Sequence, residues 1–324
     1  MIGVLLLNLG TPDASTTPAV RRYLRQFLLD ERVIDLPRAL WWPILFTQVL
    51  RTRPAKSAEL YRKIWTAEGS PLLVITRGQA RALGERLEQT MPAGVRTAVG
   101  MRYGHPSIAS AADELLDAGC DRLLAWPMYP QYSSAATGSS LELLFSHIGR
   151  RRVIPPVRVV PPYFASPEYI AALAAVATSA LADWSPEHVL LSFHGYPKRY
   201  VDLGDPYRDH CHATAHALVE AMGWSAEAVT VSFQSLFGKE EWIRPYTDVT
   251  LKALGGRRLG KLAVMCPGFT ADCLETLEEM GMTNREVYQR AGGGEYRLLP
   301  CLNTHPAWTD ALAQMAMREL SGWI

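Results

Sequence analysis

Several features that often reveal a protein's function are scarce or missing in this 324-residue sequence. No apolar run approaches the ~20 residues that cross a bilayer as a helix. Basic and acidic residues nearly cancel, at 33 and 32, which argues against nucleic acid as the main partner, because that partner needs a concentrated basic surface. The five cysteines include no CxxC pair, so a reduced, cytoplasmic setting is the simplest interpretation.

Motifs that bind nucleotides are also missing. The sequence contains neither GxGxxG nor GxxxxGK[ST], so a nucleotide-dependent enzyme is poorly supported. It contains no repeat of fixed period and no low-complexity tract. The apolar run at residues 1–10 has no basic residues before it, and we expect it to be a first core strand rather than a signal peptide.

Apolar runs of strand length alternate with longer segments of helical period. The predicted strands are residues 3–9, 96–101, 122–128, 157–160, 188–193, 229–233, 261–265 and 296–299. The predicted helices are residues 18–29, 72–90, 108–118, 167–181, 207–222, 272–289 and 306–320. Continuous apolar strands separated by helices indicate parallel sheets covered on both faces, which is an α/β fold.

A proline-rich segment at residues 154–163 divides this pattern into two halves. We therefore predict two Rossmann-like domains with parallel sheets and a cleft between them. The first covers residues 1–160 and the second covers residues 161–303. We expect the C-terminal helix, within residues 304–324, to join the first domain.

The strongest functional signal lies where the strand at residues 188–193 ends in His194, followed by a glycine and a proline. Ligands of open α/β sheets bind beyond the carboxyl ends of the strands. A second strand-to-helix junction carries Asp272 and Glu275. A histidine and carboxylates on neighbouring strand ends suit a divalent metal or proton transfer. The structural alternatives are a core histidine and a helix capping box, with Glu278 and Glu279 continuing a solvated helix face.

Two other segments admit a functional and a structural interpretation. His210, His212 and His216 lie near Cys211, but they lack the glutamate of an HExxH zinc motif, and we expect a solvent-facing cluster. Residues 36–46 are rich in tryptophan and other apolar residues. We expect an internal helix there; the alternative is an apolar surface for a large flat ligand or a membrane.

Seven motifs, taken in order, resemble those of ferrochelatases, the enzymes that insert ferrous iron into a porphyrin. They are NLGTP at 8–12, RYGHP at 102–106, YPQYSSAATGSS at 129–140, LSFHGYP at 191–197, GDPY at 204–207, FQS at 233–235 and CPGFTADCLETL at 266–277. The resemblance covers essentially the whole chain, and the last third is most similar to proteobacterial members.

The resemblance implies a porphyrin in the cleft between the two domains. It implies His194 and Glu275 as the pair at the iron site, with Asp272 in support. The positions that match residues lining the porphyrin pocket or its edge are Arg102, Tyr103, Tyr61, Gln234 and Trp242. These roles are carried over from the family.

The resemblance also implies ferrous iron as a substrate and no permanent cofactor. Animal members hold an iron–sulfur cluster on cysteines, and Ser134 stands where they have one of these. Some bacterial members hold a cluster on internal cysteines, which keeps Cys266, Cys273 and Cys301 open as ligands. We expect no [2Fe–2S] cluster.

The predicted activity is therefore insertion of Fe²⁺ into protoporphyrin IX, the last step of haem biosynthesis, by distortion of the macrocycle and removal of its pyrrole protons. Alternatives are a chelatase of the same fold for another metal or for coproporphyrin, and a non-catalytic haem carrier. We expect a cytoplasmic protein, with peripheral contact to the inner membrane left open. The sequence gives no prediction of oligomeric state.

Overall fold

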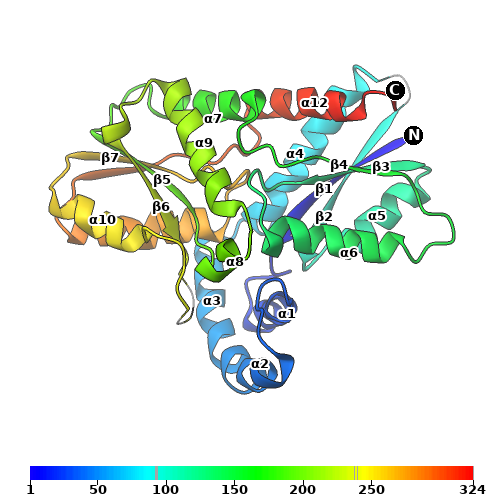
Figure 1. Ribbon diagram of the computed structural model, residues 1–324, viewed down its shortest axis with the longest axis horizontal. Coiled ribbons are helices and arrows are strands. Elements are labelled where there is room, and N and C mark those ends of the chain that lie inside the picture. The colour runs from blue at the N-terminus through cyan, green and yellow to red at the C-terminus, as the bar shows by residue number, and fades with distance from the viewer. Residues whose placement is uncertain (92–93, 237, 239, 324) are drawn as a thin grey trace. The chain divides into compact units, whose positions relative to one another are not determined.

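The computed structural model describes residues 1–91, 94–236, 238 and 240–323, and the chain divides into two compact units (Figure 1). The first unit comprises Met1–Met128, Ser133–Pro161 and Met315–Ile324, and the second comprises Tyr129–Tyr132 and Pro162–Gln314. Within the described residues each unit holds a four-stranded parallel sheet, ordered β2-β1-β3-β4 in the first and β6-β5-β7-β8 in the second. The predicted α/β class is confirmed.

The first unit is built around strand β1, which is buried along almost its whole length, as expected for a central strand of a parallel sheet. Its elements are β1 (Ile2–Gly10), α1 (Thr17–Leu28), α2 (Arg38–Ile44), η1 (Leu45–Val49), α3 (Leu50–Ile64), α4 (Pro71–Glu88), β2 (Val95–Tyr103), α5 (Ile108–Asp117), β3 (Arg122–Pro127), η2 (Ser134–Gly138), α6 (Ser139–Ile148) and β4 (Val157–Val159).

Helices cover both faces of this sheet. Leu5 and Leu7 of β1 pack with α5 and α6 in one core cluster. On the other face, α4 comes so close to β2 that a Cβ at Gly84 would lie 3.2 Å from the hydroxyl of Thr97. At the end of β1, Gly10 has a φ of +103°, and a Cβ there would meet the carbonyl oxygen of Tyr103 at 1.8 Å. Only glycine fits where the ends of β1 and β2 approach this closely.

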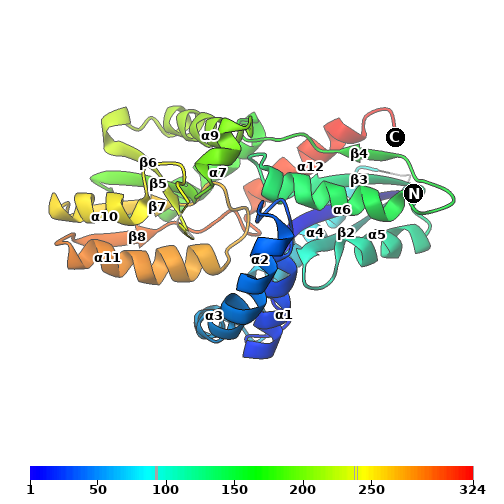
Figure 2. The ribbon, with the colours of Figure 1, turned by 60° about the horizontal axis from the view of Figure 1, so that its bottom comes forward.

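The second unit repeats the pattern with β5 at the centre between β6 and β7. Its elements are α7 (Pro167–Ala180), β5 (His188–His194), α8 (Lys198–Asp202), α9 (Tyr207–Met222), η3 (Ala226–Ala228), β6 (Val229–Gln234), α10 (Thr247–Gly256), β7 (Lys261–Met265), η4 (Glu275–Thr283), α11 (Asn284–Arg290) and β8 (Glu295–Leu298). The last helix, α12 (Pro306–Leu320), is divided between the units, because its residues from Met315 onward belong to the first unit. Figure 2 shows α7 and α9 on one side of the strands and α10 and α11 on the other.

The segment predicted as one helix at residues 272–289 begins later and is partly a π-helix in the structure. It begins as a π-helix, η4, and continues as α11. Asp272 therefore precedes the helix instead of lying in its first turn. A π-helix hydrogen-bonds from each residue to the fifth one along, and such segments are frequent at functional sites.

Residues 36–46 contain the expected helix, α2, but most of its apolar side chains are exposed. The expectation that this helix is internal is therefore wrong for those side chains. Trp41 is buried, with its indole N–H donating to the Leu28 carbonyl at 2.7 Å. Five apolar side chains are 41–64% exposed: Leu36, Leu40, Trp42, Ile44 and Phe46. We call these five residues the apolar patch. None of the helices within the described residues is long and apolar enough to cross a membrane.

Candidate active site

The carboxyl ends of β5, β6 and β7 lie side by side in the second unit, because all three strands are parallel neighbours. The last residue of β5, His194, is in register with the last residue of β6, Gln234. The segment that follows β7 leads through Asp272 into η4. Topology alone thus gathers the histidine and the acids that the sequence placed about 80 residues apart.

His194 is held in one tautomer by its own neighbour. Its Nδ1 lies 2.6 Å from the carbonyl oxygen of Gly195, and since a carbonyl only accepts, Nδ1 carries the proton. The neutral ring therefore keeps its lone pair on Nε2. The hydroxyl of Tyr207 donates to the His194 carbonyl at 3.0 Å, and the rings of Trp242 and Phe269 lie 6.4 Å from the imidazole.

Gly195 is required where it stands. A Cβ at this position would lie 2.4 Å from the carbonyl oxygen of Gln234 and 2.9 Å from the ring of Trp242. The Gly195 N–H donates to the same Gln234 carbonyl at 2.6 Å. The glycine after His194 thus lets the chain turn tightly against the end of β6.

Gln234 ties the strand ends to the π-helix. Its side-chain carbonyl accepts from Ser192 at 2.8 Å, and its amide donates to the backbone carbonyl of Glu275 at 3.1 Å. The residue is only 2% exposed. Predicted as a porphyrin-pocket residue, Gln234 is hydrogen-bonded to protein on both sides of its amide, and this geometry suits positioning of η4.

Asp272 is buried, and its carboxylate accepts hydrogen bonds from two neighbouring side chains. Its carboxylate accepts from the Thr276 hydroxyl at 2.8 Å and from the Asn303 amide at 2.7 Å. In return, the Asp272 backbone N–H donates to the Asn303 side-chain oxygen at 2.9 Å. Asn303 also donates its backbone N–H to the Thr270 carbonyl at 3.0 Å, with φ at +46°. Asn303, absent from the predicted site, clamps the segment that leads into η4.

Two glutamates of η4 lie at the same sheet edge as His194. Glu275 opens the π-helix and is partly exposed. Glu279, four residues later, accepts from both the backbone N–H of Ser235, at 2.8 Å, and its hydroxyl. Burial raises the pKa of Glu279, and Glu275 raises it further, whereas Ser235 and His194 act in the opposite direction.

The expected solvated face at Glu278 and Glu279 is therefore wrong. Glu278 is 3% exposed and accepts from the Thr283 hydroxyl at 3.1 Å. The π-helical geometry and the loop after β6 bring partners to both carboxylates. Of the acids in this region, Glu279 is the one that sequence reasoning missed.

Three of the predicted porphyrin-binding residues lie in the first unit. Tyr103, at the end of β2, is 1% exposed, and its hydroxyl donates to Asp30 at 2.7 Å. Arg102 donates to the same carboxylate and to Ser139. Burial and the Asp30 charge raise the pKa of Tyr103. Asp30 was not predicted, and it binds the end of β2 to the start of α6.

Tyr61, the third of them, lies in α3 and is buried among aromatic rings. Its ring meets Tyr23 edge-on at 6.5 Å and Trp65 edge-on at 6.1 Å. Tyr23 in turn contacts Tyr103 edge-on at 6.4 Å. Tyr61, Arg102 and Tyr103 are thus held around one aromatic cluster within the first unit.

The remaining histidines behave largely as expected. His212 and His216 are exposed, but His210 is half-buried, stacked on Phe164 with ring centroids 3.8 Å apart. Its Nδ1 accepts from the Tyr132 N–H at 3.2 Å, and burial lowers the pKa of His210. The expectation of a wholly solvent-facing cluster is wrong for this one residue.

A [2Fe–2S] cluster needs four ligands, usually cysteines. All five cysteines are buried and free, and burial raises the pKa of Cys266, Cys273 and Cys301 well above the usual value. In the part of the chain that the structure describes, no three His, Cys, Asp or Glu side chains are grouped so that they could hold a metal ion.

Comparison with known proteins identifies a family. The ferrochelatase family model matches residues 1–320. A ferrochelatase of Thioalkalivibrio sulfidiphilus is 49% identical, over 100% of this chain and 88% of the relative. A ferrochelatase of Marinobacter nauticus is 46% identical, over 99% of this chain and 87% of the relative.

Solved structures of low identity share the fold. The chelatase SirB from Bacillus subtilis, solved with Fe³⁺, superposes with a TM-score of 0.59 at 12% identity, over 99% of this chain and 96% of that one. CbiX, described as the terminal enzyme of sirohaem biosynthesis in denitrifying bacteria, gives a TM-score of 0.51 at 15% identity, over 99% of both chains. At these identities the likeness shows the chelatase fold.

Proposed function

The chain belongs to the ferrochelatase family, and from that premise we propose which of its residues carry out the chemistry. It is an enzyme, a lyase of the metal-chelatase type, that inserts iron into a porphyrin in haem biosynthesis. The predicted family and activity are confirmed. Roles for His194, Glu275, Glu279 and Asp272 are our proposal, as is protoporphyrin IX as the porphyrin.

The reaction requires a proton acceptor close to the macrocycle. A free porphyrin holds two pyrrole N–H protons, which must leave as the four nitrogens bind the metal. A neutral imidazole is suited to take a proton near pH 7. The observation that carries the proposal is the bond from Nδ1 of His194 to the Gly195 carbonyl, which leaves the Nε2 lone pair as the proton acceptor.

The acids of η4 supply the second part of the chemistry. Glu275 and Glu279 lie four residues apart on the π-helix, and the pKa of Glu279 is raised by the charge of Glu275 and lowered by His194 when the imidazole is protonated. We assign these carboxylates to the delivery of Fe²⁺ and to the onward transfer of protons. Asp272, held by Asn303 and Thr276, fixes the start of this helix.

Anaerobic incubation with Fe²⁺ and protoporphyrin IX tests this assignment by absorbance. We expect wild type to convert porphyrin to haem, and Glu275→Gln and Glu279→Gln to bind porphyrin but convert it at least about 10-fold more slowly, since positioned acid–base groups contribute ~10²–10⁴-fold. Unchanged turnover in both variants would exclude Glu275 and Glu279 from iron delivery and proton transfer. Faster conversion of coproporphyrin than of protoporphyrin would overturn the choice of porphyrin.

We also propose peripheral membrane contact through the apolar patch. Arg38 lies over the Trp42 ring at 5.8 Å, and Arg25 lies over the Phe46 ring at 5.6 Å. Apolar side chains flanked by basic groups are typical of surfaces that bind anionic lipid.

Flotation with phosphatidylglycerol vesicles tests this contact. We expect wild type to float and the Trp42→Ser/Phe46→Ser double variant to remain in solution. Val153, 82% exposed and outside the patch, gives the matched control Val153→Ser, which should float like wild type. Equal flotation of all three proteins would refute the patch as the contact.

A further inference from the structure

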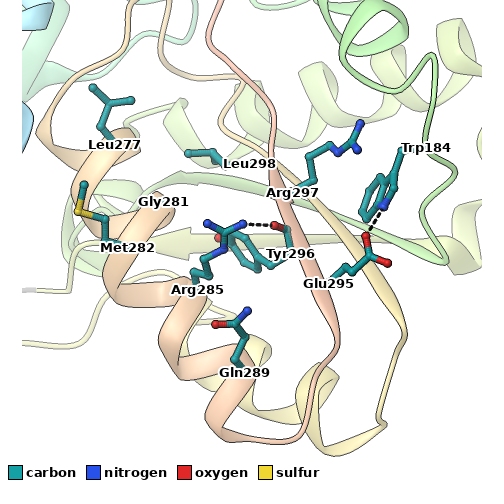
Figure 3. Close-up of a pocket in the computed structure, with 10 residues that line it drawn as sticks. All are labelled: Trp184, Leu277, Gly281, Met282, Arg285, Gln289, Glu295, Tyr296, Arg297 and Leu298. Carbon is teal, nitrogen blue, oxygen red and sulfur yellow. Dashed lines mark hydrogen bonds between the residues drawn. The ribbon is translucent and has the colours of Figure 1, made fainter.

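A pocket of about 700 Å³ in the second unit lies apart from the strand ends that carry His194. Figure 3 shows it between η4 and α11 on one side and the strand β8 on the other. Its lining residues are Trp184, Leu277, Gly281, Met282, Arg285, Gln289, Glu295, Tyr296, Arg297 and Leu298. The volume falls in the range of about 300–1,000 Å³ that holds small ligands.

The pocket has an apolar wall on the π-helix side. Leu277, Gly281 and Met282 come from η4, and Leu298 faces them from β8 (Figure 3). Gly281 lets the Leu298 side chain pack closely against η4, because a Cβ at position 281 would lie only 3.2 Å from it. Met282 is 40% exposed, and a methionine side chain adapts readily to the shape of an apolar ligand.

The pocket is lined by three charged groups, Arg285, Arg297 and Glu295, and Glu295 keeps its negative charge because its hydrogen-bond partner is a neutral indole. Arg297 pairs with Asp183 at 2.7 Å, and Glu295 accepts from the Trp184 indole at 2.8 Å. Arg285 donates to the Tyr296 carbonyl at 2.8 Å, and no carboxylate of the described residues lies within ion-pair distance of it. A guanidinium has five N–H donors, so Arg285 retains donors for an anion.

The strand edge excludes a peptide as the natural occupant. β8 pairs with β7 alone within the described residues, which leaves its other edge facing the pocket. Arg285 already occupies the Tyr296 carbonyl on that edge, and an added strand would have to displace it. A small molecule with one anionic group meets no such obstacle.

We propose that this pocket binds an amphiphilic organic anion, with a carboxylate head at Arg285 and an apolar body against Leu277, Met282 and Leu298. A planar carboxylate matches the fork of the guanidinium. The apolar wall belongs to the same π-helix that carries Glu275 and Glu279, so the ligand would lie against another face of that helix.

Calorimetric titration of the full chain with laurate, below its micellar concentration and without metal or porphyrin, tests the proposal. We expect saturable binding at one site. Arg285→Gln should weaken it about 10-fold or more, the effect of losing one hydrogen bond to a charged group. Met282→Asp should weaken it as well, by placing a carboxylate beside the ligand.

Arg290→Gln is the matched control, because Arg290 lies on α11 too but pairs with Glu286 at 2.8 Å outside the pocket. It should bind laurate like wild type. Arg285 and Arg290 are both exposed, so neither change should affect folding, which thermal melts would verify. Absent binding, or equal laurate affinity in wild type and Arg285→Gln, would overturn the proposal.

Discussion

Replacing Asn303 with alanine would remove both hydrogen bonds between the Asn303 side chain and Asp272 and leave the bond from Thr276. A hydrogen bond to a charged group contributes ~1.5–3 kcal/mol, and an unsatisfied buried N–H costs ~1–3 kcal/mol. Asn303 also has a φ of +46°, a left-handed conformation that costs alanine roughly 1–2 kcal/mol. Because such effects are not additive, we expect Asn303→Ala to lower the free energy of unfolding by about 3 kcal/mol.

A glycine at this position separates the two causes. Asn303→Gly removes the same side-chain bonds without the backbone strain, so it should be about 1 kcal/mol more stable than Asn303→Ala. Urea unfolding measures both variants. If they differ little from wild type, the clamp on Asp272 contributes no stability and the reasoning is wrong.

The same variants test the role of the clamp in catalysis. Displacement of the segment that leads into η4 should lower kcat about 10-fold or more, since misplacement by about 1 Å can cost ~10²-fold. Porphyrin affinity, measured by fluorescence quenching, should change little. Thr283→Val serves as control, because Thr283 bonds only Glu278 at the far end of η4. An equal loss of kcat in Thr283→Val would mean that general destabilisation, and no positioning of Asp272, explains the result.

Three further outcomes are expected. Burial raises the pKa of Glu279 above its usual 4.5, so protonated Glu279 stabilises the folded state at low pH, and this contribution falls as pH rises above 4.5. Glu279→Gln should therefore gain stability relative to wild type in urea melts as pH rises. A difference between the two proteins that does not change with pH would contradict this. Gly195→Ala should cost ~1–3 kcal/mol by the clash with the Gln234 carbonyl at 2.4 Å, measured by thermal melting, and a neutral effect would refute the close approach. Asp30→Asn should cost on the order of 3 kcal/mol, because it leaves Arg102 half-buried without its carboxylate, and a change below about 0.5 kcal/mol would count against that network.

The sequence predicted the strands well because a buried parallel strand has a local signature. All eight expected runs are strands, and β5 ends at His194 as its glycine and proline suggested. The helices that the sequence missed include α3, which contains a proline, and the short α8. Hydrophobic periodicity is weak evidence in segments of that kind.

The glutamates of η4 show which features a local sequence pattern cannot predict: the type of helix and hydrogen bonds to residues far along the chain. Residues 275–283 fit an α-helical period, and nothing in that period distinguishes bonds to the fourth residue from bonds to the fifth. The helical period predicts a solvated Glu279, because its partner Ser235 lies 44 residues earlier in the chain and leaves no trace in the local pattern. Asp30 pairs with residues 72 to 109 positions away. Such contacts exist only after the sheets have formed.

The most direct test of the account is the single-turnover rate of iron insertion in His194→Ala, measured anaerobically with porphyrin already bound. The account predicts a loss of ~10²–10⁴-fold in rate, as expected for removal of a general base, while porphyrin affinity and the thermal melt remain close to wild type. A rate within a few-fold of wild type would contradict the claim that Nε2 of His194 accepts the pyrrole proton.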